Sequence, residues 1–268
     1  FSTLGTGGFS TRNASIGAYN SAAIEWICFV FMFLAGINFS LYYYFFTRNF
    51  SEIKCNSELK AYIWINIISI AAIAVAQASS YGGFFKSLRF SAFQTATILT
   101  TTGFSTADYT KWKSASQIVI LMLLFIGGMS GSTAGGVKVI RWVVLYKQLK
   151  NEILKMIHPH GVFSIRLNQQ TGRKDVVFSV SAFFFLYFSF VILTAFFTSL
   201  FGLDMQTSFT GAVTMVGNCG PAFGALGPSN NCGWLAAPVK WWYSFAMIAG
   251  RLELFTIFIF LTPAYWKK

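Results

Sequence analysis

Three short polar runs centred on glycine interrupt a chain that is otherwise strongly apolar. They lie at 4–11, 100–106 and 216–221. Glycine permits positive φ angles and lets other atoms approach its backbone closely. Irregular backbone at membrane depth persists only where protein buries it or water bathes it. The sequence therefore predicts that bare backbone, more than side chains, forms the working surface of this protein.

The composition is that of an integral membrane protein. Hydrophobic residues make up 55% of the chain and charged residues only 10%, whereas an average soluble domain carries roughly 25% charged residues. A net charge of +12 would suggest a nucleic-acid-binding protein if the chain were soluble. The basic residues are not gathered into one basic face, so we expect a lipid membrane, and no nucleic acid, as the partner.

Long apolar stretches predict helices that cross the membrane, because about 20 residues are needed to cross its hydrocarbon core. Three uncharged stretches qualify, at 26–47, 61–85 and 176–203. In the second of these, the residues from Tyr81 onward are expected to leave the helix. A fourth stretch, at 114–157, is interrupted by the glycine-rich segment 127–136, and glycine at this density ends or unwinds a helix.

Two shorter apolar segments, at 87–99 and 205–216, each lead into one of the glycine runs. Segments of this length are too short to cross the membrane and are typical of re-entrant helices. Ser87 and Asp204 supply side chains suited to capping their first turns. The predicted repeating unit is helix, re-entrant pore helix, glycine loop, helix.

The repeat has a long period. Gly8, Gly103 and Gly220 align with spacings of 95 and 117 residues. Such internal repetition indicates an all-α, pseudosymmetric bundle around a central axis. A ring of four loops needs one more upstream of Phe1, and the chain begins within a motif, so we expect it to be part of a longer protein.

The basic residues predict the orientation. The connections at 48–60, 138–175 and 267–268 hold 13 of the 20 lysines and arginines, the opposite side holds six, and Arg251 lies within the membrane. Short loops rich in lysine and arginine stay on the cytoplasmic side. We therefore expect these three connections to be cytoplasmic and the glycine loops to open outward.

Five motifs, in order and between spans, carry a resemblance to a known family. They lie at 7–11, 101–106, 131–138, 217–221 and 250–253. With them the chain resembles the Trk/Ktr family of bacterial potassium transporters, specifically the C-terminal portion of the Trk membrane (pore) subunit. The resemblance implies a potassium-channel-like fold with pseudo-fourfold repeats around one pore. It divides the chain into the end of repeat two (1–47), a cytoplasmic loop (48–60), repeat three (61–157), a second cytoplasmic loop (158–175) and repeat four (176–268).

The glycine loops are candidates for a selectivity filter. A potassium ion that enters such a pore exchanges its hydration water for backbone carbonyls, and each re-entrant helix points its negative end at its loop. Ordinary glycine-rich turns are the alternative. The family usually has valine in place of Cys219, whose side chain we expect to face the scaffold. The predicted filter residues are Thr6, Gly7, Gly8, Thr101, Thr102, Gly103, Gly217, Asn218, Cys219 and Gly220.

The segment 127–136 is a candidate gate. It breaks a helix after the loop at 100–106, so we expect it beneath the filter, and the resemblance supports a gating role. A simple kink is the alternative. A phosphate-binding P-loop is excluded because Val137, and not lysine, follows the last glycine. The predicted gating residues are Gly127, Gly128, Gly131, Ser132, Thr133, Gly135, Gly136 and Arg251.

Arg251 lies in the middle of the last apolar segment, 238–263. An ionised group at that depth costs several kcal/mol unless it faces water or a partner. Glu253 lies about 200° away around a helix, so the two side chains are expected to face apart. We predict that Arg251 points into the pore below the filter as an electrostatic barrier to cations. A structural ion pair with an acid on another helix is the alternative.

These observations predict potassium uptake through a central pore, with K⁺ as the transported ion and no organic cofactor. The sequence offers no Ser/His/Asp set, carboxylate pair or metal cluster, which argues against an enzyme. An alternating-access transporter that couples K⁺ to H⁺ or Na⁺ is the main alternative, and a structural membrane anchor is a weaker one.

The resemblance also implies partners. Nucleotide-binding regulatory subunits of the RCK/KTN type are expected to dock on the basic cytoplasmic surface at 138–174, and the protein is expected to be a multi-pass homodimer in the bacterial inner membrane. The preference for K⁺ over Na⁺, any coupling ion and the regulatory nucleotide stay open at this point. A disulfide between Cys219 and Cys232, which lie 13 residues apart, stays open as well.

Overall fold

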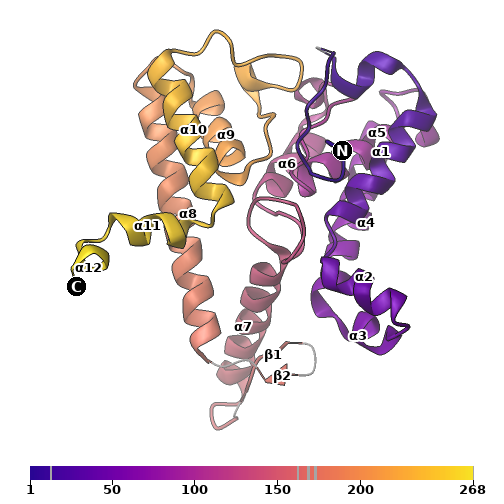
Figure 1. The fold of residues 1–268 in the computed structure, drawn as a ribbon. Helices are drawn as coiled ribbons and strands as arrows, with labels where there is room; N and C mark the ends of the chain where they lie inside the picture. The colour runs from indigo at the N-terminus through magenta and orange to yellow at the C-terminus, as the bar shows by residue number, and fades with distance from the viewer. Residues whose placement is uncertain (13, 162, 168–169, 172–173, 268) are drawn as a thin grey trace.

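The computed structural model describes residues 1–12, 14–161, 163–167, 170–171 and 174–267, and helices dominate this part of the chain (Figure 1). Two groups of three helices lie side by side. The first group is α1 (Ala22–Ala35), α4 (Ser57–Gln77) and α5 (Phe84–Leu99). The second group is α8 (Lys174–Ser199), α9 (Met205–Gly217) and α10 (Ala237–Arg251).

The two groups repeat one arrangement. In the first, α5 packs against α1 and α4, and in the second, α9 packs against α8 and α10. Helices α6 (Ser114–Leu124) and α7 (Val139–Ile157) run between the groups, α6 touching α5 and α9 while α7 touches α4 and α8. The Tyr109 hydroxyl, in the connection after α5, also donates to the carbonyl oxygen of Ala222, in the connection after α9, at 2.9 Å. The predicted all-α repeat of long and re-entrant helices is confirmed.

Two helices of the described chain are long and apolar enough to cross a membrane by themselves, namely α4 and α8. The predicted spans 61–85 and 176–203 correspond to them. Helix α4 ends at Gln77, so the residues around Tyr81 leave the helix as predicted. Large apolar side chains such as Phe178, Phe185 and Phe196 are more than 60% exposed on α8, as expected for a surface that faces lipid.

The predicted span 26–47 and the apolar segment 238–263 each contain a sharp bend that was not predicted. Helix α1 and α2 (Phe39–Phe46) meet at an angle of 93°, and α10 and α11 (Leu254–Leu261) at 111°. At the first break the Asn38 side chain accepts a hydrogen bond from Ser40 N and starts a new helix. At the second, Glu253 has a φ of 62° and interrupts the helix.

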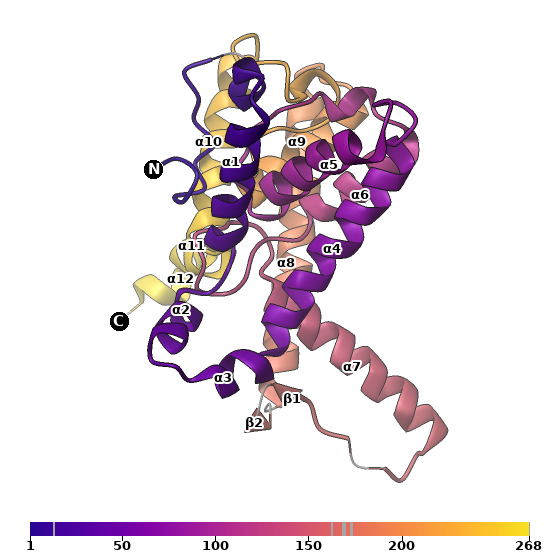
Figure 2. The same cartoon turned by 90° about the vertical axis from the view of Figure 1, so that its right-hand side faces the viewer.

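The predicted interruption at 127–136 is present. Helix α6 ends at Leu124 and α7 begins at Val139. In Figure 1 the chain between them forms a loop at the centre of the molecule, and Figure 2 shows α7 leading away from the bundle toward the end where α3 (Phe50–Cys55) lies. One apolar stretch of sequence is thus divided into a helix, an irregular segment and a second helix.

The two short helices that precede glycine loops begin differently. Asp204 caps α9 as predicted, and its carboxylate accepts from Thr207 N at 3.1 Å. These hydrogen bonds from Thr207 hold the pKa of Asp204 below its ordinary value. The predicted cap at Ser87 is wrong, because α5 begins at Phe84 and the Ser87 hydroxyl donates to the Ala74 carbonyl at 2.8 Å. Ser87 instead ties α5 to α4.

The segments predicted as plain cytoplasmic loops contain short elements. Helix α3 and the start of α4 occupy much of 48–60, and a two-stranded antiparallel hairpin pairs β1 (Arg166–Leu167) with β2 (Gln170–Thr171) within 158–175. The remaining described elements are η1 (Ser15–Tyr19), η2 (Tyr109–Lys111), η3 (Gly224–Leu226) and α12 (Pro263–Trp266).

Candidate functional site

The three glycine runs meet around one cavity of about 640 Å³. The structure therefore brings together segments that lie about 100 residues apart in the sequence. Gly217 is the one predicted filter residue that does not line the cavity, and it is the last residue of α9. The nine that do line it are Thr6, Gly7, Gly8, Thr101, Thr102, Gly103, Asn218, Cys219 and Gly220.

The three loops share one backbone hydrogen-bond pattern. Thr6 N, Thr101 N and Asn218 N each donate to the carbonyl three residues earlier, at 3.0–3.3 Å. In each loop the next N–H donates to the carbonyl five residues earlier, at 2.9 Å. This pairing is typical of a helix end that closes through a left-handed residue. The hydrogen bonds thus confirm, from geometry, the alignment of the loops made from the sequence.

The backbone angles repeat as well. Thr6, Thr101 and Asn218 have φ angles of 49°, 53° and 57°, although residues with a Cβ rarely adopt positive φ. Two residues later in each loop stands a glycine that also has positive φ: Gly8, Gly103 and Gly220 at 64°, 87° and 99°. Strained backbone of this kind persists only where the surrounding structure enforces it, and it gathers at functional sites.

Glycine is required here because the loops touch one another. A Cβ atom on Gly8 would overlap the carbonyl oxygen of Thr102, and one on Gly103 would lie 2.7 Å from the carbonyl oxygen of Cys219. Real side chains do not reach such distances from backbone atoms. The first loop therefore packs directly against the second, and the second against the third.

The side chains of the loops are bound to the scaffold. The Thr101 hydroxyl accepts from Gly135 N at 2.6 Å, and the Asn218 amide donates to the Met247 carbonyl at 3.0 Å. The Cys219 thiol is buried and lies 3.6 Å from the Ile98 carbonyl, so it faces the scaffold as expected. Cys219 and Cys232 are both free thiols. Backbone is left as the main polar surface of the cavity.

The segment 127–136 forms a narrow loop that contacts this site. Gly127 N donates to the Val137 carbonyl at 2.8 Å, and Val139 N donates to the Gly128 carbonyl at 3.1 Å, which closes the base of the loop. A Cβ on Gly127 would overlap the Gly135 carbonyl. The glycines of this segment therefore allow its two ends to run in contact.

This loop contacts all three glycine runs. The Thr6 hydroxyl donates to the Thr133 carbonyl at 2.9 Å, and Gly135 N is bound to Thr101 as described above. A Cβ on Gly135 would lie 2.6 Å from the Gly217 carbonyl. A change in the position of the loop would therefore alter its contacts with each of the glycine runs.

One residue that fixes the loop was not among the predicted site residues. The Glu58 carboxylate, buried in the first turn of α4, accepts from Ser130 N at 2.7 Å and from Ile140 N at 3.0 Å. It thus bridges the loop to the start of α7. Glu58 is one of only eight acidic residues in the chain, and that scarcity, next to a span, is the signal that would have singled it out.

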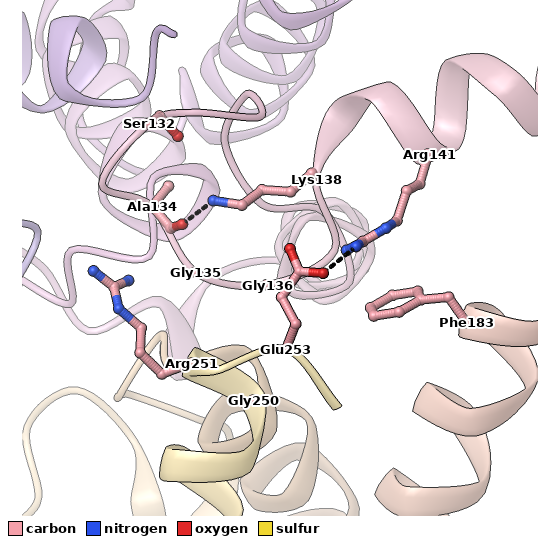
Figure 3. A pocket seen from close by; sticks show the side chains of 10 residues that line it. All are labelled: Ser132, Ala134, Gly135, Gly136, Lys138, Arg141, Phe183, Gly250, Arg251 and Glu253. Carbon is pink, nitrogen blue, oxygen red and sulfur yellow. Dashed lines mark hydrogen bonds and ion pairs between the residues drawn. The ribbon is translucent and has the colours of Figure 1, made fainter. Parts of the chain in front are cut away.

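Arg251 contacts the segment 127–136. Its Nη1 donates to the Thr133 carbonyl at 2.8 Å. Arg251 lines both the cavity of the glycine runs and a second cavity of about 260 Å³, which Figure 3 shows. The ion pairs in the described part of the chain do not include Arg251, which disfavours the structural ion pair considered above.

The predicted gating residues take different places. Ser132, Gly135, Gly136 and Arg251 line the second cavity, and Thr133 binds Arg251 through its carbonyl. Gly127, Gly128 and Gly131 instead shape the loop. Figure 3 also shows three charged side chains around this cavity that were not predicted as gating residues: Lys138, Arg141 and Glu253.

Arg251 and Glu253 do face apart, but for a different reason than a 200° step around a helix. Helix α10 ends at Arg251, and Glu253 stands at the break before α11. The Arg141 Nη2 donates to Glu253 Oε2 at 2.6 Å. Lys138 Nζ donates to the Ala134 carbonyl. The second cavity is therefore lined by charged groups that are bound to one another and to the loop.

Comparison with known proteins adds the family. The family model described as "TrkH: Cation transport protein" matches residues 1–63 and 65–268. The chain is 34% identical over 268 residues to the Trk system potassium uptake protein TrkI of Halomonas elongata, covering 99% of this chain and 54% of that protein. It is 32% identical over 273 residues to TrkG of Escherichia coli strain K12, covering 100% of this chain and 55% of that protein.

A solved structure has the same fold. The crystal structure of the potassium transporter TrkH from Vibrio parahaemolyticus matches with a TM-score of 0.92 at 32% identity, over 99% of this chain and 57% of that one. The chain thus spans about half the length of the curated relatives it matches.

Proposed function

This chain belongs to the TrkH family of cation transport proteins, a family of transporters and not of enzymes, and from that membership we propose that it conducts potassium ions through the cavity of its three glycine loops. The relatives named above are Trk system potassium uptake proteins. Potassium is then the substrate, and the backbone carbonyls of the loops replace part of its hydration shell.

One observation carries the proposal. Three loops from distant parts of the chain share the same hydrogen bonds and the same positive φ angles, and they line one cavity of about 640 Å³. Helices α5 and α9 end at two of these loops, where the negative end of the helix dipole favours a cation. Since the side chains are bound to the scaffold, the carbonyls are the groups that meet the ion.

The segment 127–136 and Arg251 are the proposed gate. The loop touches all three glycine runs, and the Arg251 guanidinium lies beside it against both cavities. A fixed positive charge in a cation path raises the energy of an ion that passes it. Movement of the loop together with Arg251 would open the path.

Orientation and partners complete the proposal. In Figure 1 the elements of the lysine- and arginine-rich connections, α3 and the β1–β2 hairpin, lie at the lower end, opposite the connection between α9 and α10. This grouping supports a cytoplasmic lower end in the bacterial inner membrane. Nucleotide-binding regulatory subunits of the RCK/KTN type dock there, and the protein works as a homodimer. The division into repeats at 1–47, 61–157 and 176–268 belongs to the same proposal.

A matched pair of glycine substitutions tests the filter. Gly103 and Gly202 have nearly equal φ angles, 87° and 85°, but a Cβ on Gly202 meets nothing within 4 Å. Backbone strain is therefore similar in Gly103→Ala and Gly202→Ala, and only the first pushes one loop away from another. In full-length protein reconstituted in vesicles, we expect Gly103→Ala to lower potassium uptake about tenfold or more and Gly202→Ala to retain most of it.

Equal uptake in the two variants would contradict the proposed filter.

Recordings in planar bilayers separate the two transport mechanisms, because discrete unitary currents fit a pore and not alternating access. Currents that vanish when potassium is replaced by an impermeant cation would identify the conducted ion.

A further inference from the structure

A second charged contact holds the gating segment, at a point that Arg251 does not touch. The Arg141 guanidinium of α7 pairs with Glu253 at 2.6 Å and lies over the ring of Phe183 in α8, 3.7 Å from its centroid. Three segments that are distant in sequence therefore meet at one side chain (Figure 3). Arginine suits this role, since its planar group pairs with a carboxylate and stacks on an aromatic face at once.

This contact sits directly after the loop. Arg141 lies three residues beyond Lys138, the N-cap of α7, and Arg141 N donates to the Lys138 carbonyl at 3.0 Å. Val139 N, also in this first turn, closes the base of the loop on Gly128. Because a helical turn moves as a unit, whatever fixes Arg141 fixes the end of the segment 127–136.

The partner carboxylate also stands at a special position. Glu253 has a φ of 62° at the break between α10 and α11, and a residue with a Cβ is held in that region only by its surroundings. Two residues earlier, Arg251 binds Thr133 near the tip of the loop. One helix break thus binds the loop near its tip through Arg251, and the helix that follows the loop through Glu253.

We propose that Arg141, Glu253 and Phe183 form a clamp that holds α7 against the α10–α11 break and thereby keeps the segment 127–136 in the position seen in this structure. The three are positioning residues for the gate, and the proposal rests on the proposed function. Opening of the gate then requires this ion pair to separate, so loosening the clamp raises the probability that the pore is open without changing the current through an open pore.

A double-mutant cycle tests the clamp in the full-length protein. The variants are Arg141→Gln, Glu253→Gln and the two combined, and the readouts are potassium uptake by vesicles and single-channel recordings. The Glu253 side chain is 53% exposed and that of Arg141 is 17% exposed. A pair of this exposure supports a rise in open probability of about two- to fivefold in each single variant. The double variant should show no further rise, because both changes remove one contact.

Three further variants supply the controls. Arg141→Lys keeps the charge but loses the flat contact with Phe183, so its rise should be smaller than that of Arg141→Gln. Phe183→Leu should also give a smaller rise and serves if a glutamine variant does not fold. Lys111→Gln removes an ion pair between an exposed lysine and Asp108 and should leave the open probability unchanged.

Several results would overturn the clamp. These are an unchanged open probability in folded Arg141→Gln and Arg141→Lys, additive effects in the double variant, or a change confined to the unitary current. If Arg251→Ala and Gly103→Ala alter transport while the clamp variants do not, the clamp is wrong and the proposed function stands. If none of these variants alters potassium transport, the proposed function itself fails.

Discussion

Two helix breaks bind the same loop, one through backbone groups and the other through charged side chains. We call residues 35–38, between α1 and α2, the backbone-held break, and residues 251–253, between α10 and α11, the side-chain-held break. At the first, Met129 N donates to the Gly36 carbonyl at 2.9 Å and Phe39 N donates to the Gly131 carbonyl at 3.1 Å. Both ends of these hydrogen bonds are main chain.

The side-chain-held break has no such contacts in the described residues. Its grip on the loop consists of Arg251 on the Thr133 carbonyl and of the Arg141–Glu253 ion pair. Long charged side chains exchange rotamers and are screened by salt, whereas main-chain hydrogen bonds move only with the chain itself. We therefore expect the loop to stay fixed on the side of α1 and α2 and to be released on the side of α10 and α11.

The largest expected effect comes from the backbone-held break. A Cβ on Gly36 would overlap the Tyr62 hydroxyl and lie 2.8 Å from Thr100 Cγ2, so Gly36→Ala should destabilise the protein by about 1–3 kcal/mol through overpacking. Thermal unfolding in detergent measures this. Gly83→Ala is the control, because a Cβ there meets nothing within 4 Å. Equal unfolding temperatures in the two variants would remove the special status of this break.

The next effect concerns the side-chain-held break. Arg251→Ala removes a positive charge and one bond to the loop, and we expect potassium flux through reconstituted protein to rise about tenfold, equivalent to roughly 1.4 kcal/mol. Lys240→Ala, on the same helix but bound to Gly233, is the matched control and should leave the flux unchanged. An Arg251→Ala protein with unaltered flux would refute the role assigned to this arginine.

A smaller effect is expected from Tyr62→Phe. The Tyr62 hydroxyl donates at 2.9 Å to the Phe33 carbonyl near the end of α1, one of the carbonyls that a helix end leaves without a helical partner. Losing a buried hydrogen bond costs about 1 kcal/mol of stability. Thermal unfolding should show this loss while potassium flux per folded molecule stays constant. A large change in flux would mean that this side of the loop is releasable too.

The smallest effect is the response to salt. Raising the ionic strength from about 0.05 M to about 0.5 M with an impermeant salt screens the half-exposed Arg141–Glu253 pair, and we expect about a twofold rise in flux. The Glu253→Gln protein should respond much less, since it has already lost the pair. A salt response of the same size in both proteins would place its origin elsewhere.

The two helix breaks were not predicted from the sequence. Apolar composition indicates that a segment suits lipid, but it carries no information on where a helix bends, so the bends within 26–47 and 238–263 were not predicted. A local signal did exist at the first, where Asn38 caps a new helix. None exists at the second, because neither glycine nor proline marks Leu252 and Glu253, and the bend depends on contacts with distant helices.

The glycine loops were predictable for the opposite reason. Polar glycine runs in an apolar chain can be recognised from neighbouring residues alone, because two of them follow a segment too short to span the membrane. Their alignment at Gly8, Gly103 and Gly220 agrees with the backbone geometry. Arg251 was predictable because charge is so unusual at that depth. Arg141 and Phe183 were not, since their importance arises only from partners that the fold brings close.

The close contact between Gly103 and the Cys219 carbonyl also bears on how the protein is made. Translation delivers these two residues at different times, and chains acquire structure from the N-terminus onward during synthesis. The loop at 100–106 therefore lacks this contact until the later helices have entered the bilayer. The proposed ion path is therefore complete only after the chain from α8 onward has been made.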